Sequence, residues 1–153
     1  MPDRLVPDTR DRYAHFTTIN TRWMDNDVYG HVNNAVYYSW IDTAVNRLLV
    51  EQGLLNTDPH APVGLVVRNE CQYFQSISFP QDVEVGLRIG KLGTSSITYE
   101  LGIFVHGSLD PACARATLVH VYVDPHTRRP CPLTDAHVQK LGAFTVNEAG
   151  RSR

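Results

Sequence analysis

The segment from residue 25 to residue 34, Asp-Asn-Asp-Val-Tyr-Gly-His-Val-Asn-Asn, gathers side chains that can do chemistry. Two carboxylates, Asp25 and Asp27, precede an imidazole, His31, and the amides of Asn33 and Asn34. A helical pattern of apolar residues starts directly afterwards, so the segment is predicted to form a loop at the N-terminal end of a helix. The first backbone N–H groups of a helix lack intrahelical partners and favour negative charge nearby.

Three interpretations of this segment compete. In a structural one, Asp25 or Asp27 accepts hydrogen bonds from free N–H groups, and Gly30 permits the turn. In a second, Asp25, Asp27 and His31 bind a metal, although a further ligand is needed and the other histidines give no spacing motif. In a third, a carboxylate acts as a base or nucleophile while the helix N–H groups stabilise an oxyanion. The residue types alone leave all three open.

The long helix that would position this loop is marked by apolar residues at helical spacing, and Gly53 stands where its C-terminal cap should be. Its stripe is wide, so a large surface must cover it. The residues of the stripe are Val36, Tyr37, Trp40, Ile41, Ala44, Leu48 and Leu49.

The rest of the chain is predicted to be mainly strands, with a short connection at 108–111 that indicates hairpins and therefore antiparallel pairing. A short last helix is expected at 134–144, capped by Thr134. An antiparallel sheet curled around the long helix would bury both apolar surfaces, which makes the fold class α+β. The predicted strands are 13–23, 63–74, 82–92, 96–107 and 112–124.

Length and composition predict one soluble domain over residues 1–153, with a core at about 13–144 and loose termini at 1–11 and 146–153. The formal net charge of −2 argues against nucleic-acid or anionic-membrane partners. The N-terminus has no apolar core typical of a secretory signal, and the three cysteines are widely spaced. We therefore expect a cytoplasmic protein with reduced thiols.

The segment Arg-Trp-Met-Asp-Asn-Asp-Val-Tyr-Gly-His-Val-Asn-Asn-Ala-Val-Tyr-Tyr-Ser-Trp-Ile-Asp-Thr-Ala, residues 22–44, resembles the signature of hotdog-fold acyl-CoA thioesterases of the 4-hydroxybenzoyl-CoA thioesterase group. That signature reads aromatic-x-D-x-D-x-x-G-x-V-x-x-x-x-Y and precedes the long helix. Residues 72–104 resemble the strand pair that carries the G-D-x-L-x-V and G-x-x-S segments of the group. The resemblance spans roughly residues 13–144.

This resemblance implies a hotdog fold, in which an antiparallel curved sheet is wrapped around one long central helix. The implied activity is hydrolysis of a fatty or aromatic acyl-CoA to free acid and CoA, with no metal and no organic cofactor. The implied assembly is a homodimer or homotetramer with the site at the subunit interface. No nucleic-acid or membrane partner is expected.

The resemblance also carries roles to particular residues. Asp27, three residues before Gly30, matches the catalytic carboxylate, which acts as base or nucleophile. The backbone N–H near Asn34 matches the donor that polarises the thioester carbonyl. Many relatives have a histidine or an aromatic residue at the place of Asn34, so the role of its amide side chain is open, as is that of His31. Asp25 matches a less constant, structural acid.

Other residues are expected at the substrate, each with a plainer alternative. Basic residues would meet the phosphates of CoA, or be solvated surface charges; Ser95 and Ser96 would face the substrate, or cap a strand end. Tyr37 would wall the acyl pocket, or pack in the core. The full set expected to bind substrate is Gly30, Val32, Asn33, Tyr37, Ser95, Ser96, Arg68, Arg88, Lys91 and Arg128.

Two alternative functions stay open at this point. A hotdog dehydratase or hydratase would require His31 to be essential and Asp27 replaceable. A non-catalytic acyl-CoA binding module would tolerate Asp27→Asn. A fold alone does not decide among these functions.

Overall fold

The computed structural model describes residues 6–146. Two short 3-10 helices, two α-helices and five strands follow one another along this part of the chain. In chain order they are η1 (Arg10–Arg12), β1 (His15–Ile19), η2 (Trp23–Asp25), α1 (Asn34–Glu51), β2 (Val63–Tyr73), β3 (Val83–Leu92), β4 (Ser96–Val105), β5 (Ala114–Val123) and α2 (Asp135–Gly142).

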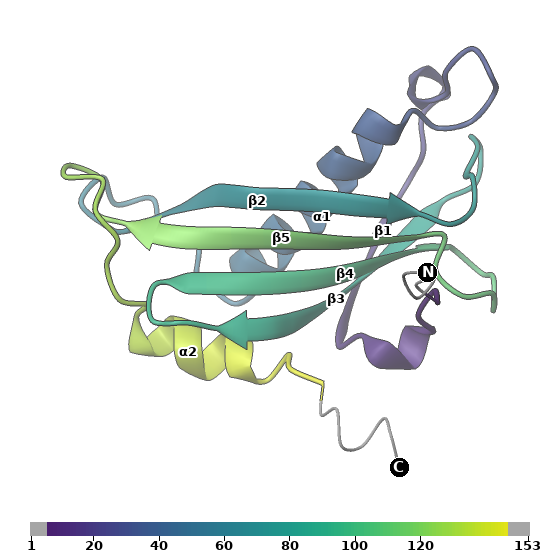
Figure 1. The fold of residues 1–153 in the computed structure, drawn as a ribbon. Coiled ribbons are helices and arrows are strands. Elements are labelled where there is room, and N and C mark those ends of the chain that lie inside the picture. Colours follow the sequence, from purple (N-terminus) through teal and green to yellow (C-terminus); the bar gives the residue numbers. More distant parts are fainter. Residues whose placement is uncertain (1–5, 147–153) are drawn as a thin grey trace, which may run out of the picture.

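The strands form one antiparallel sheet in the order β1-β3-β4-β5-β2. The long helix α1 crosses one face of this sheet, behind β2 and β5 in the view of Figure 1. This arrangement confirms the predicted α+β hotdog architecture, an antiparallel sheet around one long helix. None of the helices in the described residues is long and apolar enough to cross a membrane.

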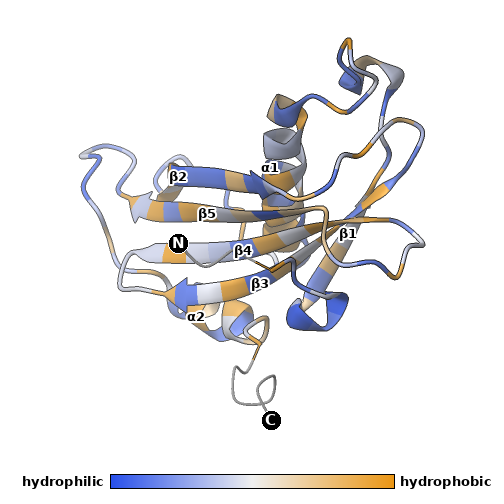
Figure 2. Ribbon diagram, turned by 45° about the vertical axis from the view of Figure 1, so that its right-hand side comes forward, coloured by the Kyte–Doolittle hydropathy of each residue, from blue (hydrophilic) through white to orange (hydrophobic). Residues whose placement is uncertain are grey.

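The core lies between α1 and the sheet. Alternate residues of β4 and β5, and most residues of the first part of β3, are buried. Figure 2 shows orange hydrophobic bands along these strands. From α1, Ile41, Leu48 and Leu49 are almost fully buried against them. Each such side chain contributes about 1.5–3 kcal/mol through removal of apolar surface from water.

The C-terminal end of α1 follows its predicted signal, whereas the cap at its N-terminal end is Asn33 and not Asp25 or Asp27. The Asn33 side chain caps the helix by accepting a hydrogen bond from the Ala35 N–H at 2.9 Å. Gly53 follows the last turn with φ +67°, a left-handed conformation that favours glycine. In α2, the hydroxyl of Thr134 accepts from the His137 N–H, as expected of its cap.

The predicted strand at 13–23 is longer than β1. The chain leaves the sheet after Ile19 because Arg22 and Asp25 bond to each other around η2. The sequence of β2 starts with an apolar run, which alone would suit a buried strand. It is half-exposed, since β2 is an edge strand, with Leu65 36% and Val67 59% exposed.

The expectation of a loose N-terminal tail is wrong for the described residues that follow Pro7. The Arg10 guanidinium bonds to Glu84 and to the carbonyls of Val105 and Ser108, and the Asp8 carboxylate accepts from the Tyr13 hydroxyl. These contacts fasten the segment to the face of the sheet opposite α1. Residues 1–5 and 147–153 of the expected loose termini lie outside the described residues.

Candidate active site

Asp25 stabilises the loop before α1 through hydrogen bonds at both ends of the loop. This residue is 2% exposed, and its carboxylate accepts from the backbone N–H of Arg22 at 2.7 Å and from the Arg22 guanidinium at 2.9 Å. Its carbonyl accepts from the Asn33 N–H at 2.8 Å. All these bonds are within the loop, so Asp25 holds the loop in shape, as the sequence predicts.

Asp27 occupies a tight turn within this loop. Its N–H donates to the His31 carbonyl at 2.8 Å, and its own carbonyl accepts from the Gly30 N–H at 3.0 Å. Its carboxylate oxygen Oδ1 accepts from the Tyr29 N–H at 2.8 Å. Among the described residues no donor is bonded to Oδ2. One oxygen therefore fixes the carboxylate, and the other is available for chemistry.

The connection between β2 and β3 clamps this turn from outside. The Ser78 hydroxyl donates to the Gly30 carbonyl at 2.9 Å, and the Phe79 N–H donates to Oδ1 of Asn26 at 3.1 Å. The Val32 N–H donates to the Ile77 carbonyl at 2.8 Å. The position of Asp27 thus depends on a segment almost 50 residues further along the chain.

The N-terminal end of α1 leaves one donor free. Asn33 takes up two N–H groups, because its side chain accepts from Ala35 and its carbonyl accepts from Val36. The Asn34 N–H has no acceptor among the described residues. It is the first N–H of an 18-residue helix, and the helix dipole adds to its attraction for negative charge.

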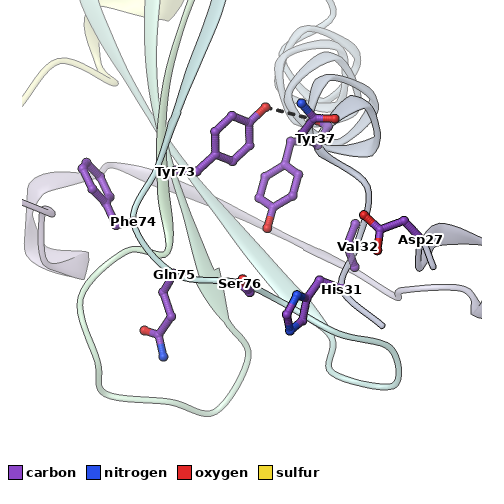
Figure 3. Close-up of a pocket in the computed structure, with 9 residues that line it drawn as sticks. Asp27, His31, Val32, Tyr37, Tyr73, Phe74, Gln75 and Ser76 are labelled. Carbon is purple, nitrogen blue, oxygen red and sulfur yellow. Dashed lines mark hydrogen bonds between the residues drawn. The ribbon is translucent and has the colours of Figure 1, made fainter. Parts of the chain in front are cut away.

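A cavity of about 430 Å³ brings these groups together. Figure 3 shows Tyr37 from α1 beside Tyr73 from the end of β2, with Asp27, Val32 and His31 on the loop before the helix. Gln75 and Ser76 line another wall. The residues that line the cavity are Asp27, His31, Val32, Asn34, Tyr37, Tyr73, Phe74, Gln75 and Ser76.

The two tyrosines of this cavity are hydrogen-bond donors at neutral pH. Burial raises the pKa of Tyr37 to about 12 and also raises that of Tyr73. The Tyr73 hydroxyl donates to the Asn34 carbonyl at 3.1 Å, the dashed line in Figure 3. This bond joins the end of β2 to the first residue of α1.

The cavity contains five of the residues expected from the sequence, Asp27, His31, Val32, Asn34 and Tyr37. Gly30 and Asn33 lie in the same loop and hold its turn and its helix cap. Sequence reasoning missed the four residues that β2 and the connection after it contribute. No motif marks them; the only signal was the end of a predicted strand. They are Tyr73, Phe74, Gln75 and Ser76.

The remaining expected residues do not line this cavity. Arg88 is 4% exposed, and its guanidinium bonds to Glu100 and to the Arg12 carbonyl on the face of the sheet opposite α1. Arg68 pairs with Glu70 on the exposed part of β2. Ser95, Ser96 and Lys91 belong to β3, β4 or the turn between them, and Arg128 follows β5.

The metal interpretation gains no support from the donor set. Within residues 6–146, no three histidine, cysteine, aspartate or glutamate side chains are arranged to hold a metal ion. Asp25, one of the three ligands considered, is committed to Arg22. The arrangement instead places Asp27, whose Oδ2 has no donor, and Asn34, whose N–H has no acceptor among the described residues, on the lining of one cavity.

Two comparisons of the sequence with known proteins find relatives. The family model described as the thioesterase-like superfamily matches residues 21–141. A 1,4-dihydroxy-2-naphthoyl-CoA hydrolase of Gloeothece citriformis is 29% identical over 132 residues, which cover 83% of this chain and 91% of that protein.

Solved structures share the fold. The PA5185 protein of Pseudomonas aeruginosa strain PAO1 has a TM-score of 0.87 at 44% identity, covering 93% of this chain and 99% of that one. Slr0204, a 1,4-dihydroxy-2-naphthoyl-CoA thioesterase from Synechocystis, has a TM-score of 0.76 at 17% identity, covering 83% and 94%. At that identity the second likeness concerns the fold alone.

Proposed function

This chain belongs to the thioesterase-like superfamily and is a thioester hydrolase, and we propose that it cleaves the thioester of a fatty or aromatic acyl-CoA to free acid and CoA. The observation that supports the proposal is that Asp27 and Asn34, whose N–H has no acceptor among the described residues, line one cavity. An aromatic acyl group is favoured, since the relative from Gloeothece citriformis is named for an aromatic acyl-CoA.

In the proposed reaction the thioester carbonyl oxygen lies against the Asn34 N–H. Negative charge develops on that oxygen as the carbon is attacked, and one well-aimed donor is worth about 3 kcal/mol in the transition state. The C–S bond then breaks, and CoA leaves as a thiolate that takes up a proton. Water is the only co-reactant, and the reaction uses neither a metal nor an organic cofactor.

Asp27 has two candidate roles in this scheme. As a general base, Oδ2 takes a proton from the water that attacks the carbonyl carbon. As a nucleophile, Oδ2 attacks the carbon itself and forms an anhydride, which water then hydrolyses. In both roles Oδ1 stays bonded to the Tyr29 N–H, so the orientation of the carboxylate is kept.

The proposed enzyme is a homodimer or homotetramer of the cytoplasm. Support for the assembly comes from β2, an edge strand whose Leu65, Val66 and Val67 are exposed. An exposed apolar edge strand is a ready template for pairing with another chain. The free thiols of Cys71, Cys113 and Cys131 suit a reducing compartment.

The first test is thiol release from short, long and aromatic acyl-CoAs by the wild type and by Asp27→Asn. Loss of a base or nucleophile should lower kcat more than about a hundredfold. Undiminished activity of Asp27→Asn would refute the role of this carboxylate. Absence of turnover with every ester would refute the proposed reaction and direct attention to a hydratase assay and a binding titration.

The second test addresses the N–H of Asn34 without disturbing the helix. Proline is favoured at the first position of a helix and has no N–H, and Asn33, with φ −59° and ψ 135°, has the conformation that proline prefers before it. Asn34→Pro should lower kcat about 100- to 1,000-fold. Asn34→Ala, which keeps the N–H, is the matched control and should stay within a few-fold of wild type.

A further inference from the structure

A second cavity lies at the other end of α1, between that helix, the start of β2 and the end of β5. Its volume is about 230 Å³. Asn46 on its rim lies about 18 Å along the helix from Asn34, at 1.5 Å per residue. The residues that line it are Asp42, Asn46, Leu49, Leu54, Leu55, Asn56, Pro62, Val63, Gly64, Val66, His120 and Tyr122.

His120 is the unusual residue of this cavity. It lies in β5 directly opposite Val66 of β2, and its side chain is 5% exposed. Burial lowers the pKa of its imidazole, so the ring is neutral at pH 7 and has one donor and one acceptor. Neither ring nitrogen has a hydrogen-bond partner among the described residues, and Nδ1 is fully buried. A buried polar group without a partner calls for a ligand or another explanation.

The residues around His120 determine which kind of ligand can reach its imidazole. Tyr99 and Tyr122 contact it edge-on, with ring centroids 5.5 and 6.3 Å away. Gly64 leaves room for Tyr122, since a Cβ there would lie 3.1 Å from the tyrosine ring. The other walls are mostly aliphatic side chains from α1, β2 and the segment between them.

Charge excludes one class of ligand. Asp42 is the one charged residue among those that line the cavity, and the lining has no lysine or arginine. A carboxylate or phosphate would therefore be desolvated without a counter-charge. The cavity suits an uncharged molecule.

We infer that this cavity binds a small neutral molecule with an apolar ring and a hydroxyl group, and that the hydroxyl bonds to the His120 imidazole. A dry cavity of about 150 Å³ holds one benzene molecule, so 230 Å³ holds one substituted ring. The site is separate from the Asp27 cavity, and the inference does not depend on the proposed thioesterase reaction.

The test compares phenol, toluene and benzoate by NMR titration of the full chain. Phenol should shift the His120 imidazole nitrogens and bind about tenfold more tightly than toluene, which has the ring without the hydroxyl. Benzoate should not bind there. In His120→Phe, phenol and toluene should bind equally, whereas His126→Phe, at an exposed histidine, should keep the preference. Asp27→Asn should bind phenol as wild type does.

Equal affinities for phenol and toluene in the wild type would overturn the inference. So would a preference for phenol that persists in His120→Phe, or shifts confined to the residues of the Asp27 cavity. If His120→Phe fails to fold, the wild type still decides, because phenol must bind it about tenfold more tightly than toluene, and bound phenol must shift an imidazole nitrogen further than bound toluene does.

Discussion

The hydroxyl of Tyr73, at the end of β2, donates a hydrogen bond to the backbone carbonyl of Asn34, 3.1 Å away. The two residues are 39 positions apart in the chain, and both line the cavity of Asp27. The bond fixes the first turn of α1 relative to the sheet. The direction of the Asn34 N–H, which the proposed reaction uses, is therefore set partly from β2.

Removing the Tyr73 hydroxyl should impair catalysis, through the position of the Asn34 N–H, more than it lowers the stability of the fold. In Tyr73→Phe we expect kcat/KM to fall about five- to tenfold, because misplacement of a reacting group is costly. The free energy of unfolding should fall by about 1 kcal/mol, the worth of one hydrogen bond. Thiol-release kinetics and urea unfolding measure the two. Tyr29→Phe, at an exposed tyrosine of the loop before α1, should change neither, because it keeps the backbone N–H that bonds to Asp27. An unchanged kcat/KM in Tyr73→Phe would show that the bond has no part in catalysis.

Two glycines with nearly the same positive φ allow backbone strain to be told apart from an effect on catalysis. Gly30 has φ +78° and Gly107 has φ +81°, and a Cβ at either would meet nothing within 4 Å. Alanine at each should therefore lower the free energy of unfolding by about 1–2 kcal/mol through left-handed strain alone. Only Gly30→Ala should also lower kcat, by about tenfold, because the Gly30 N–H bonds to the Asp27 carbonyl. Equal activities of the two variants would refute this role of the turn.

Buried His120 should make the fold sensitive to acid. Burial lowers its pKa in the folded state, whereas in the unfolded chain the pKa is about 6.5. Above that pH both states are neutral; below it the unfolded chain takes up a proton first, so the free energy of unfolding falls as the pH falls. His120→Phe should remove this contribution to the slope, at most about 1.4 kcal/mol per pH unit, below pH 6.5. Urea unfolding at several pH values measures it; the exposed His126→Gln should keep the wild-type slope.

The sequence predicted best what is local. The start of α1 and its end at Gly53 depend on residues within a few positions of each other, and the D-x-D-x-x-G segment forms its turn through bonds between neighbours. The alternation of buried residues along β4 and β5 is also a local property, because a strand with one buried face has a period of two.

Long-range contacts could not be predicted in this way. The sequence around Tyr73 does not indicate its contact with Asn34, which lies 39 positions away. The same holds for Ser78 and Gly30, which are 48 positions apart. Arg88 looked like a surface cation for a phosphate, but the N-terminal segment covers it and Glu100 pairs with it. Leu65 is exposed because β2 lies at the edge of the sheet. That position follows from the order of the strands, and the periodicity of the sequence does not predict strand order.

The exposed edge of β2 gives the test of the proposed assembly. Lysines on an edge strand oppose pairing with another chain, so Leu65→Lys with Val67→Lys should shift the protein from a dimer or tetramer to a single chain. Light scattering after gel filtration measures the mass. If a second copy completes the site, thiol release should fall with the loss of assembly and recover as the protein concentration is raised. Leu109→Lys, at a loop leucine that is 97% exposed, adds the same charge away from β2 and should change neither. A double variant that keeps the wild-type mass would show that this edge is not the interface.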